Sequence, residues 1–362
     1  MSTNIFAFII VLGILIFFHE LGHFLVARFF KVGVERFSLG FGPRLIGKKV
    51  GITEYQISAI PLAGYVKMVG EEPDSIIDPD VIPLSFTHKH VFKRILILAA
   101  GPIFNLLLAV IIFFGIFQAS GVYILQPAIG KVEAGSPAQK GGLKKGDLIN
   151  AIDSKDMESW DEMSEVIKQS NGNPMTFSVD RNGELFVTEI RPKIITGKNI
   201  FGEDQKRYVI GITASGDFLT KDLNPFQAIG ESVIQTYRIA KLTIVSVIKL
   251  IQGTVSTKTL GGPIMIAEMA GQQAKEGIVS FVFFIALLSI NLAVLNFLPI
   301  PVLDGGHLLF FSIELLTGRP VNIRIREIAQ QAGVFVLLLL MVFVFYNDIN
   351  RIWPSIKSMW PS

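Results

Sequence analysis

The chain has 362 residues, of which 50% are hydrophobic and 17% charged, and its mean hydropathy is +0.51. This composition excludes an ordinary soluble protein of this length and favours a membrane protein with several spans. The net charge of +3 is spread without a basic block, which argues against nucleic acid as a partner. Because the chain has no cysteine, any metal would need His, Asp or Glu ligands.

Four stretches are long and apolar enough to cross a bilayer as helices, which takes about 20 residues. They are residues 5–30, 95–117, 278–298 and 328–346. The first is interpreted as a retained span, because no basic region precedes it and no small-residue cleavage signal follows it. Basic residues gather between the first two spans, so this connection is predicted to be cytoplasmic and the long region after the second span extracytoplasmic.

The region between the second and third spans is soluble in character. Residues 119–215 hold short apolar runs separated by Gly, Asn and Asp turns, which predicts a β-rich domain with about two helices. Its segment EAGSPAQKGGLKKGDLINAID, residues 133–153, resembles a PDZ domain, a module that binds extended peptides by strand addition. A domain that only caps the membrane portion is the alternative.

Residues 216–277 form a linker, in which 225–252 have apolar residues at helical spacing with Lys and Arg between them. This pattern predicts an amphipathic helix at the membrane surface, and a plain linker helix is the alternative. The expected division of the chain is therefore 1–118, 119–215, 216–277 and 278–362.

The sequence HELGH interrupts the first span with three ionisable residues, His19, Glu20 and His23. Residues four apart lie on one face of a helix, so both imidazoles point to a common place. H-E-x-x-H on a helix is typical of zinc metalloproteases, with the glutamate as general base. Histidines that only hydrogen-bond to neighbours are the alternative, but unpaired ionisable groups in hydrocarbon cost several kcal/mol each. The pattern therefore favours a metal site.

A catalytic zinc ion takes three protein ligands and keeps one position open, so a third ligand is needed. Asp304 is the preferred candidate, because it follows the third span in a Pro- and Gly-rich segment, 296–306. Non-helical backbone at membrane depth is found where it is buried or lines a wet cavity. His307 ranks second, and His88 and His90 lie in a polar stretch where exposure is expected.

With HELGH in the first span and N-x-x-P-x-P-x-L-D-G-G at 296–306, the sequence resembles the site-2 protease family of intramembrane metalloproteases. Further matching segments are PLAGYVKM (61–68), AAGPIFNLLLA (99–109) and GGPIMIAEMAG (261–271). The resemblance implies Zn²⁺ as the cofactor, with Glu20 as catalytic base and with the ligands His19, His23 and Asp304. It also implies substrate-binding residues, namely Gly64, Asn291, Asn296, Pro299 and Pro301.

The fold class predicted is a polytopic α-helical membrane protein with four transmembrane helices, a membrane-associated β-loop at 35–68 and an inserted PDZ-like β-rich domain. The β-loop is expected to pair with an unwound substrate. By the resemblance, the protein lies in a bacterial inner membrane, with its active site toward the cytoplasm and one PDZ domain outside. Its expected partners are the lipid bilayer and membrane-spanning protein substrates, such as trimmed anti-sigma factors or remnant signal peptides.

Two other functions stay open at this point. A membrane zinc transporter would use the same His and Asp ligands without needing Glu20 beside them. A catalytically inactive scaffold would bind peptides through its PDZ domain alone. Asn105, the one strongly polar residue of the second span, is interpreted as a polar contact between helices.

Overall fold

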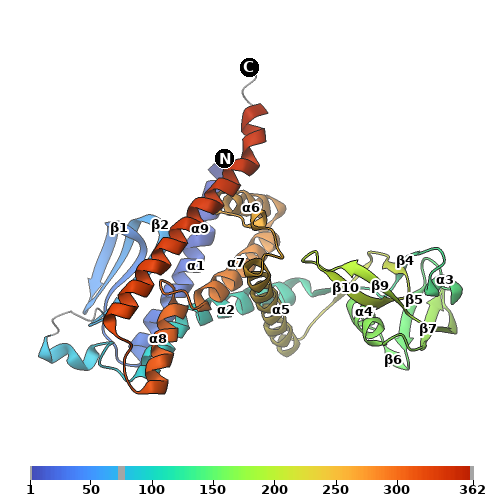
Figure 1. Ribbon diagram of the computed structural model, residues 1–362, viewed down its shortest axis with the longest axis horizontal. Coiled ribbons are helices and arrows are strands. Elements are labelled where there is room, and N and C mark those ends of the chain that lie inside the picture. The colour runs from blue at the N-terminus through green and yellow to red at the C-terminus, as the bar shows by residue number, and fades with distance from the viewer. Residues whose placement is uncertain (1, 72–77, 359–362) are drawn as a thin grey trace. The chain divides into compact units, whose positions relative to one another are not determined.

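A computed structural model describes residues 2–71 and 78–358. Contacts between Cα atoms divide the chain into two units (Figure 1). The helical unit comprises residues 1–115, 229–247 and 256–362, and the β-rich unit comprises 116–228 and 248–255. Each unit has its own buried core, so each is described by itself.

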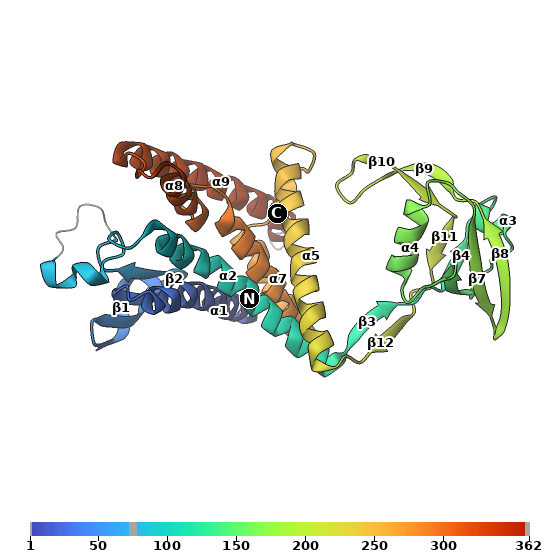
Figure 2. The ribbon, with the colours of Figure 1, turned by 90° about the horizontal axis from the view of Figure 1, so that it is seen from below.

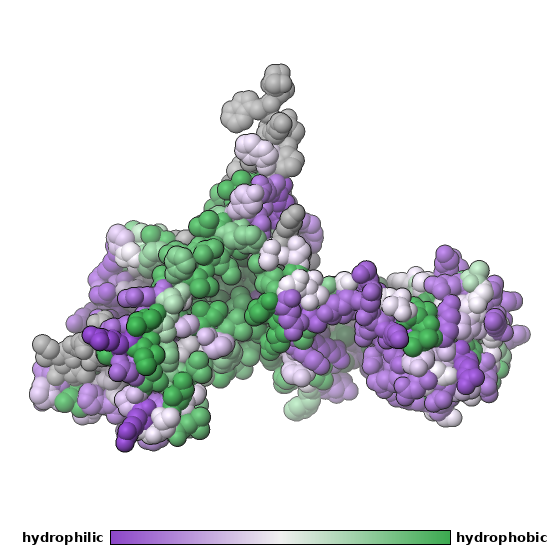
Figure 3. Space-filling model, viewed as in Figure 1, coloured by the Kyte–Doolittle hydropathy of each residue, from purple (hydrophilic) through white to green (hydrophobic). Residues whose placement is uncertain are grey.

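Four helices in the described part of the chain are long and apolar enough to cross a membrane. They are α1 (Ser2–Phe29), α2 (Val91–Ser120), α7 (Ile278–Phe297) and α9 (Ile323–Ser358). Hydrophobic side chains cover much of the face of the helical unit that Figure 3 shows. In the apolar window of α9 only 11% of the residues are buried, as expected of a helix whose sides face lipid. The four helices and the β-rich insertion agree with the fold class predicted from the sequence.

Small residues let the helices of this unit approach closely. Gly22 of α1 lies against the backbone of Ala100 in α2, where an added Cβ would overlap the Ala100 carbonyl. Between α2 and α7, the Ser289 hydroxyl donates to the Asn105 backbone carbonyl at 2.7 Å. Contacts of both kinds hold helices together in membranes, where no hydrophobic force drives them to associate.

The β-loop predicted at 35–68 is a long hairpin of β1 (Val34–Val50) and β2 (Thr53–Met68). Phe37 pairs with both Tyr55 and Val66, so each strand bends and contributes two segments. The order across the sheet is 44–50, 53–58, 34–39 and 64–68. Segment 64–68 is therefore an edge of this sheet, and it is the part of the hairpin that continues toward Gly33 and Val69.

Most of α5 (Pro225–Ile251) also belongs to the helical unit. Three shorter helices complete this unit. These are α6 (Pro263–Glu276), α8 (Asp304–Thr317) and the 3₁₀ helix η1 (Pro79–Leu84), and a further 3₁₀ turn is η2 (Thr257–Thr259). Asp348 of α9 is 1% exposed and accepts hydrogen bonds from the backbone N–H groups of Gly262, Ile264 and Met265. A carboxylate in that place satisfies the first N–H groups of α6.

The β-rich unit is built from short strands around two helices, α3 (Pro137–Lys140) and α4 (Trp160–Gln169). The strands are β3 (Val122–Leu125), β4 (Ile129–Val132), β5 (Leu148–Ile152), β6 (Lys155–Asp156), β7 (Met175–Arg181), β8 (Glu184–Ile190), β9 (Lys193–Lys198), β10 (Asp204–Val209), β11 (Ile212–Ala214) and β12 (Phe218–Lys221). One sheet has the order β6-β5-β7-β8. The pairs β3–β12, β4–β11 and β9–β10 are antiparallel (Figure 2).

A single apolar core fills the β-rich unit. Alternate residues of β7, Met175, Phe177 and Val179, are buried, whereas Leu185 and Val187 of β8 are exposed. Ser159 caps the N-terminus of α4, because its hydroxyl accepts from the Glu162 N–H, and α4 buries Met163 and Ile167. Short strands with alternating burial around two helices agree with the β-rich domain that the sequence predicted for this region.

Candidate metal centre and active site

The two histidines of HELGH lie one turn apart on the same face of α1. Their Nε2 atoms are 3.3 Å apart, and the rings meet edge to face with centroids 4.8 Å apart. His23 is 6% exposed. Because both Nε2 atoms point to one place, α1 supplies two ligand positions by its helical geometry alone.

Asp304 reaches the same place from the first turn of α8. Its Oδ2 lies 3.1 Å from Nε2 of His19 and 3.6 Å from Nε2 of His23. This oxygen is buried, and apart from the two imidazoles it has no hydrogen-bond partner among the described residues. The N-terminus of a helix favours a carboxylate, so the start of α8 suits Asp304 in its charged form.

The turn between α7 and α8 explains how Asp304 arrives there. Proline ends regular helix, and two prolines at 299 and 301 separate the helices, with the Ile300 N–H bonding back to the Leu298 carbonyl at 2.7 Å. An added Cβ at Gly305 would overlap Leu298, and one at Gly306 would overlap Ile300. Only glycine permits this close return of the chain, so the Pro and Gly residues of the motif fold the turn tightly.

The arrangement of the three side chains fits a tetrahedral metal ion. Zinc holds nitrogen and oxygen ligands at about 2.0–2.2 Å, so two ligands at a tetrahedral angle are about 3.3 Å apart. The three separations here are 3.1, 3.3 and 3.6 Å. Among the described residues these three form the one group of at least three His, Asp or Glu side chains able to hold a metal ion.

Helix α2 lines the other side of the histidines. Nδ1 of His23 lies 2.9 Å from the Ile97 carbonyl, and a metal-binding imidazole commonly donates its other N–H to such an acceptor. Gly101 faces the rings, where an added Cβ would overlap His23 and come within 2.9 Å of His19. Neither Ile97 nor Gly101 was predicted as a site residue, because the sequence does not show which face of α2 packs against α1.

Glu20 is 8% exposed and lies within electrostatic range of His19, His23 and Asp304. The edge segment of β2 passes beside it. An added Cβ at Gly64 would come within 2.7 Å of Cγ of Glu20 and 2.9 Å of the Ser38 carbonyl. The structure therefore brings Gly64 and Glu20 together, and glycine is the residue that the available space admits.

The other predicted substrate-binding residues lie on α7 and in the following turn. The Asn291 side-chain oxygen accepts a hydrogen bond from the Thr243 hydroxyl of α5 at 2.7 Å. Asn296 is half-buried near the end of α7. Pro299 is exposed and Pro301 half-buried, and the latter packs against Gly333 of α9.

The competing histidines do not join the metal cluster. His307 lines a separate cavity of about 70 Å³ with Arg94 and Arg326. Nδ1 of His88 lies 3.0 Å from the Ser85 hydroxyl, and Nδ1 of His90 accepts from the Phe92 N–H. The structure thus groups the first choice of third ligand, Asp304, with the histidines of α1.

Sequence comparison identifies the family. The profile of peptidase family M50 matches residues 7–340. The chain belongs to peptidase family M50, the site-2 protease family. A relative from Mesorhizobium japonicum, named "Putative zinc metalloprotease", is 36% identical over 94% of this chain and 97% of its own length. Relatives with the same kind of name from Campylobacter jejuni and Rickettsia conorii are 37% and 36% identical, each over 97% of this chain and over 94% and 99% of their own lengths.

Solved structures similar to this chain include PDZ domains of SdrC-like proteins. Those from Listeria monocytogenes and Listeria innocua cover 26% and 25% of this chain at 22% and 23% identity, with TM-scores of 0.21 and 0.20. TM-scores of this size do not assign the fold of the β-rich unit.

Proposed function

We propose that this M50 protein is an intramembrane zinc endopeptidase that cleaves the membrane-spanning segments of single-span proteins. The observation that carries the proposal is the convergence of two imidazole nitrogens and one carboxylate oxygen at 3.1–3.6 Å, the spacing of tetrahedral zinc ligands. His19, His23 and Asp304 would hold the ion. The position of Glu20 directly after the first histidine supports a protease over a transporter, which has no use for a general base there.

The chemistry divides between the metal and Glu20. Zinc bound at this site would polarise the peptide carbonyl and lower the pKa of a bound water to about 7. Glu20 would accept the proton from the attacking water and deliver it to the nitrogen of the leaving amine. Its burial between α1 and the edge of β2 suits this role, because a fixed, partly dehydrated carboxylate transfers protons at a defined place.

A membrane-spanning substrate is helical, so its peptide bond must leave the helix before cleavage. Unwound backbone needs new hydrogen-bond partners, which hydrocarbon does not supply. We infer that the edge segment 64–68 of β2 supplies them by strand addition, with Gly64 giving the substrate backbone access beside Glu20. Asn291 and Asn296 are proposed to hold further backbone groups, and Pro299 and Pro301 to shape this side of the cleft.

The β-rich unit is proposed to be a PDZ domain that filters substrates or binds a newly cut C-terminus. A groove of about 230 Å³ lies between α4 and β11, and β11 pairs with β4 alone in the described chain. Ile167 and Ile195 give this groove apolar walls, and Lys168 and Arg207 give it positive charge. These features suit an extended peptide with an apolar, carboxylate-bearing end.

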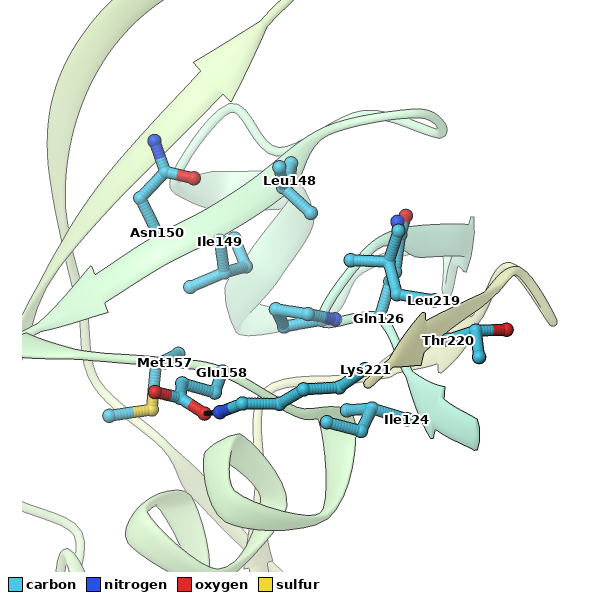
Figure 4. Close-up of a pocket in the computed structure, with 11 residues that line it drawn as sticks. Ile124, Gln126, Leu148, Ile149, Asn150, Met157, Glu158, Leu219, Thr220 and Lys221 are labelled. Atoms are coloured by element: carbon cyan, nitrogen blue, oxygen red, sulfur yellow. Dashed lines mark hydrogen bonds and ion pairs between the residues drawn. The ribbon is translucent and has the colours of Figure 1, made fainter. Parts of the chain in front are cut away.

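A larger cavity of about 410 Å³ lies elsewhere in the same unit, between the β3–β12 ribbon and β5 (Figure 4). Lys221 of β12 forms an ion pair with Glu158 at 2.7 Å there. Because Glu158 neutralises the charge of Lys221, we assign binding of a carboxylate-bearing peptide end to the groove beside α4, which has Lys168 and Arg207.

The proposed substrates are membrane proteins already trimmed by another protease, such as anti-sigma factors, or remnant signal peptides. The proposed location is a bacterial inner membrane, with the active site open to the cytoplasmic side and the β-rich unit outside. Basic residues between α1 and α2 support this orientation.

The test is incubation of the purified full-length protein with a model transmembrane peptide, with and without a zinc chelator. We expect cleavage that the chelator stops and that added zinc restores. Cleavage insensitive to chelation would refute the zinc mechanism. Zinc uptake into vesicles without cleavage would favour the transporter, and peptide binding without cleavage would favour the inactive scaffold.

A further inference from the structure

Asn105 is a fully buried amide in the middle of α2 that touches the metal cluster. Its Nδ2 lies 3.4 Å from Nδ1 of His19. Its side-chain oxygen is buried and has no hydrogen-bond partner among the described residues. An unsatisfied buried polar group costs about 1–3 kcal/mol, and such a group beside a candidate active site calls for a functional explanation.

An asparagine amide can present either its NH₂ group or its oxygen to a neighbour by a half-turn of the side-chain end, and both orientations fill the same volume. Each orientation suits one tautomer of the neutral His19 ring. The NH₂ group donates to a bare Nδ1, whereas the oxygen accepts from Nδ1–H. Asn105 therefore has a correct partner for either protonation pattern of this histidine.

A metal ion selects one of these pairings. Nε2 of His19 is the atom that faces Asp304 and His23, at 3.1 and 3.3 Å. A nitrogen that binds a metal carries no proton, so the single proton of the neutral ring must then sit on Nδ1. That N–H points at Asn105, and the orphaned oxygen is the group that can accept it.

We propose that Asn105 is a positioning residue of the zinc site, whose side-chain oxygen accepts the Nδ1–H of His19 and holds that ring in its metal-binding tautomer. The inference rests on the proposed function, because it concerns a zinc ligand. His23 has the equivalent partner in the Ile97 carbonyl at 2.9 Å. Helix α2 thus orients both histidines of α1, one through its backbone and the other through a side chain.

The interpretation of Asn105 as a simple polar contact between helices makes a different prediction. Such a contact contributes about 0.6 kcal/mol to helix association and has no specific effect on metal binding. The backbone of Asn105 does make a contact of that kind, through the Ser289 hydroxyl of α7. Ser289 therefore provides a matched control that loosens the same turn of α2 without changing the partner of His19.

The experiment measures zinc affinity of the full-length protein in detergent by competition with a chelating dye, with thermal unfolding as a check on folding. Asn105→Leu keeps the number and branching of the heavy atoms but removes both polar groups, and Asn105→Ala removes them without adding apolar bulk. We expect zinc affinity to fall about 10- to 100-fold in both, the usual effect of losing an outer-shell partner. Asn105→Asp, which can only accept, should bind zinc at least as tightly as wild type, and Ser289→Ala should bind it unchanged.

Equal zinc affinity in wild type, Asn105→Leu and Asn105→Ala would overturn the inference while leaving the proposed function intact. An Asn105→Asp variant as weak as Asn105→Leu would also overturn it, because the site would then need the amide for packing and not an acceptor. A wild-type protein that binds no zinc would refute the proposed function itself and the inference with it.

Discussion

Each unit of the protein has an aspartate with a buried carboxylate oxygen, Asp147 in the β-rich unit and Asp304 in the helical unit, and the two oxygens differ in their hydrogen-bond donors. Asp147 of the β-rich unit is 0% exposed and accepts hydrogen bonds from Nε and a terminal nitrogen of Arg181 at 2.7 and 2.8 Å, and from the Lys144 N–H at 2.7 Å. In the helical unit, the buried Oδ2 of Asp304 faces two imidazoles and has no other hydrogen-bond partner among the described residues.

Asp147 is a structural carboxylate, because its oxygens are already hydrogen-bonded, whereas the buried oxygen of Asp304 is free to bind a metal ion. Burial by itself raises the pKa of Asp147, but the hydrogen bonds from Arg181 and from the Lys144 backbone outweigh burial, so the pKa lies below its ordinary value. Asp147 is therefore kept charged, and its hydrogen bonds stabilise the Gly146-Asp147 turn before β5. A buried oxygen that lacks such donors is costly unless a cation compensates it, which is the condition at Asp304.

The largest effect is expected at Glu20, which acts on the reaction without holding the metal. Glu20→Gln removes the proton acceptor but keeps size and polarity, so cleavage of a transmembrane peptide should fall about 10²- to 10⁴-fold. Zinc content measured on the same preparation should stay at the wild-type level. Wild-type turnover by this variant would remove Glu20 from the mechanism.

The second-largest effect is expected at Gly101 of α2, where the absence of a side chain leaves space for the imidazole rings of the two histidines. Gly101→Ala would place a methyl group onto the ring of His23, so zinc affinity should fall about 100-fold. Gly115→Ala in the same helix is the control, because nothing lies within 4 Å of its added Cβ. Equal zinc affinity in the two variants would show that α2 does not shape the site.

A substitution at Asp147 should lower the stability of the β-rich unit without changing zinc affinity. Asp147→Ala leaves the Arg181 guanidinium without its partner, and we expect that unit to lose about 2 kcal/mol of its free energy of unfolding. Hydrogen exchange of the β5 and β7 amides in the full-length protein would measure this loss. Zinc affinity should be unchanged. Loss of both stability and zinc affinity would mean that Asp147 and Asp304 do not act independently.

The same pair gives a pH dependence of defined sign. Because the pKa of Asp147 is lower in the folded protein than its ordinary value of 3.8, the pair stabilises the folded state above about pH 4. This contribution is lost as the pH falls through the folded pKa. Asp147→Asn should make protection of β5 less sensitive to acid, which the same exchange measurement at pH 7 and pH 3 would test.

The smallest effect is expected at Gly64, where β2 passes Glu20. Gly64→Ala would force Cγ of Glu20 or the backbone of Ser38 to move, and misplacement of a catalytic group by about 1 Å costs up to about 100-fold in rate. We expect a 10-fold lower kcat with normal zinc content. Gly13→Ala in α1, which meets nothing within 4 Å, should leave kcat unchanged, and identical kinetics for both variants would contradict the role of this edge.

Much of the fold could be predicted because its signals are local. Apolar length predicted all four spanning helices, and the linker helix predicted at 225–252 is α5. The ends were less well predicted, since α9 begins five residues before the expected Ile328 and extends beyond Tyr346. Polar ends of a helix resemble a loop in hydropathy, and here Asp348 lies in such an end and caps α6.

At the candidate site, the sequence could nominate ligands but not their surroundings. HELGH predicts two ligands and a base, because helical periodicity places His19 and His23 on one face of the helix. Asp304 was predicted as the third ligand because few other candidates lie in apolar segments. Ile97, Gly101 and the contact of Asn105 with His19 could not be read from the sequence. They depend on which face of α2 packs on α1, and hydropathy is nearly uniform around both helices.

The sequence by itself, through its composition and its match to a family profile, determined that this is a membrane protein of peptidase family M50. It also determined that two imidazoles and a carboxylate lie within one helical turn of each other in the first span. The membrane character follows from composition, and the common face of the two imidazoles follows from their spacing along a single helix. Only the tertiary structure decided that Asp304 meets those imidazoles across 281 residues, counted from His23. It also decided that a buried amide of α2 faces one ring and that an edge of β2 lies beside Glu20. Contacts between distant segments depend on packing and chain reversal, which no local pattern encodes.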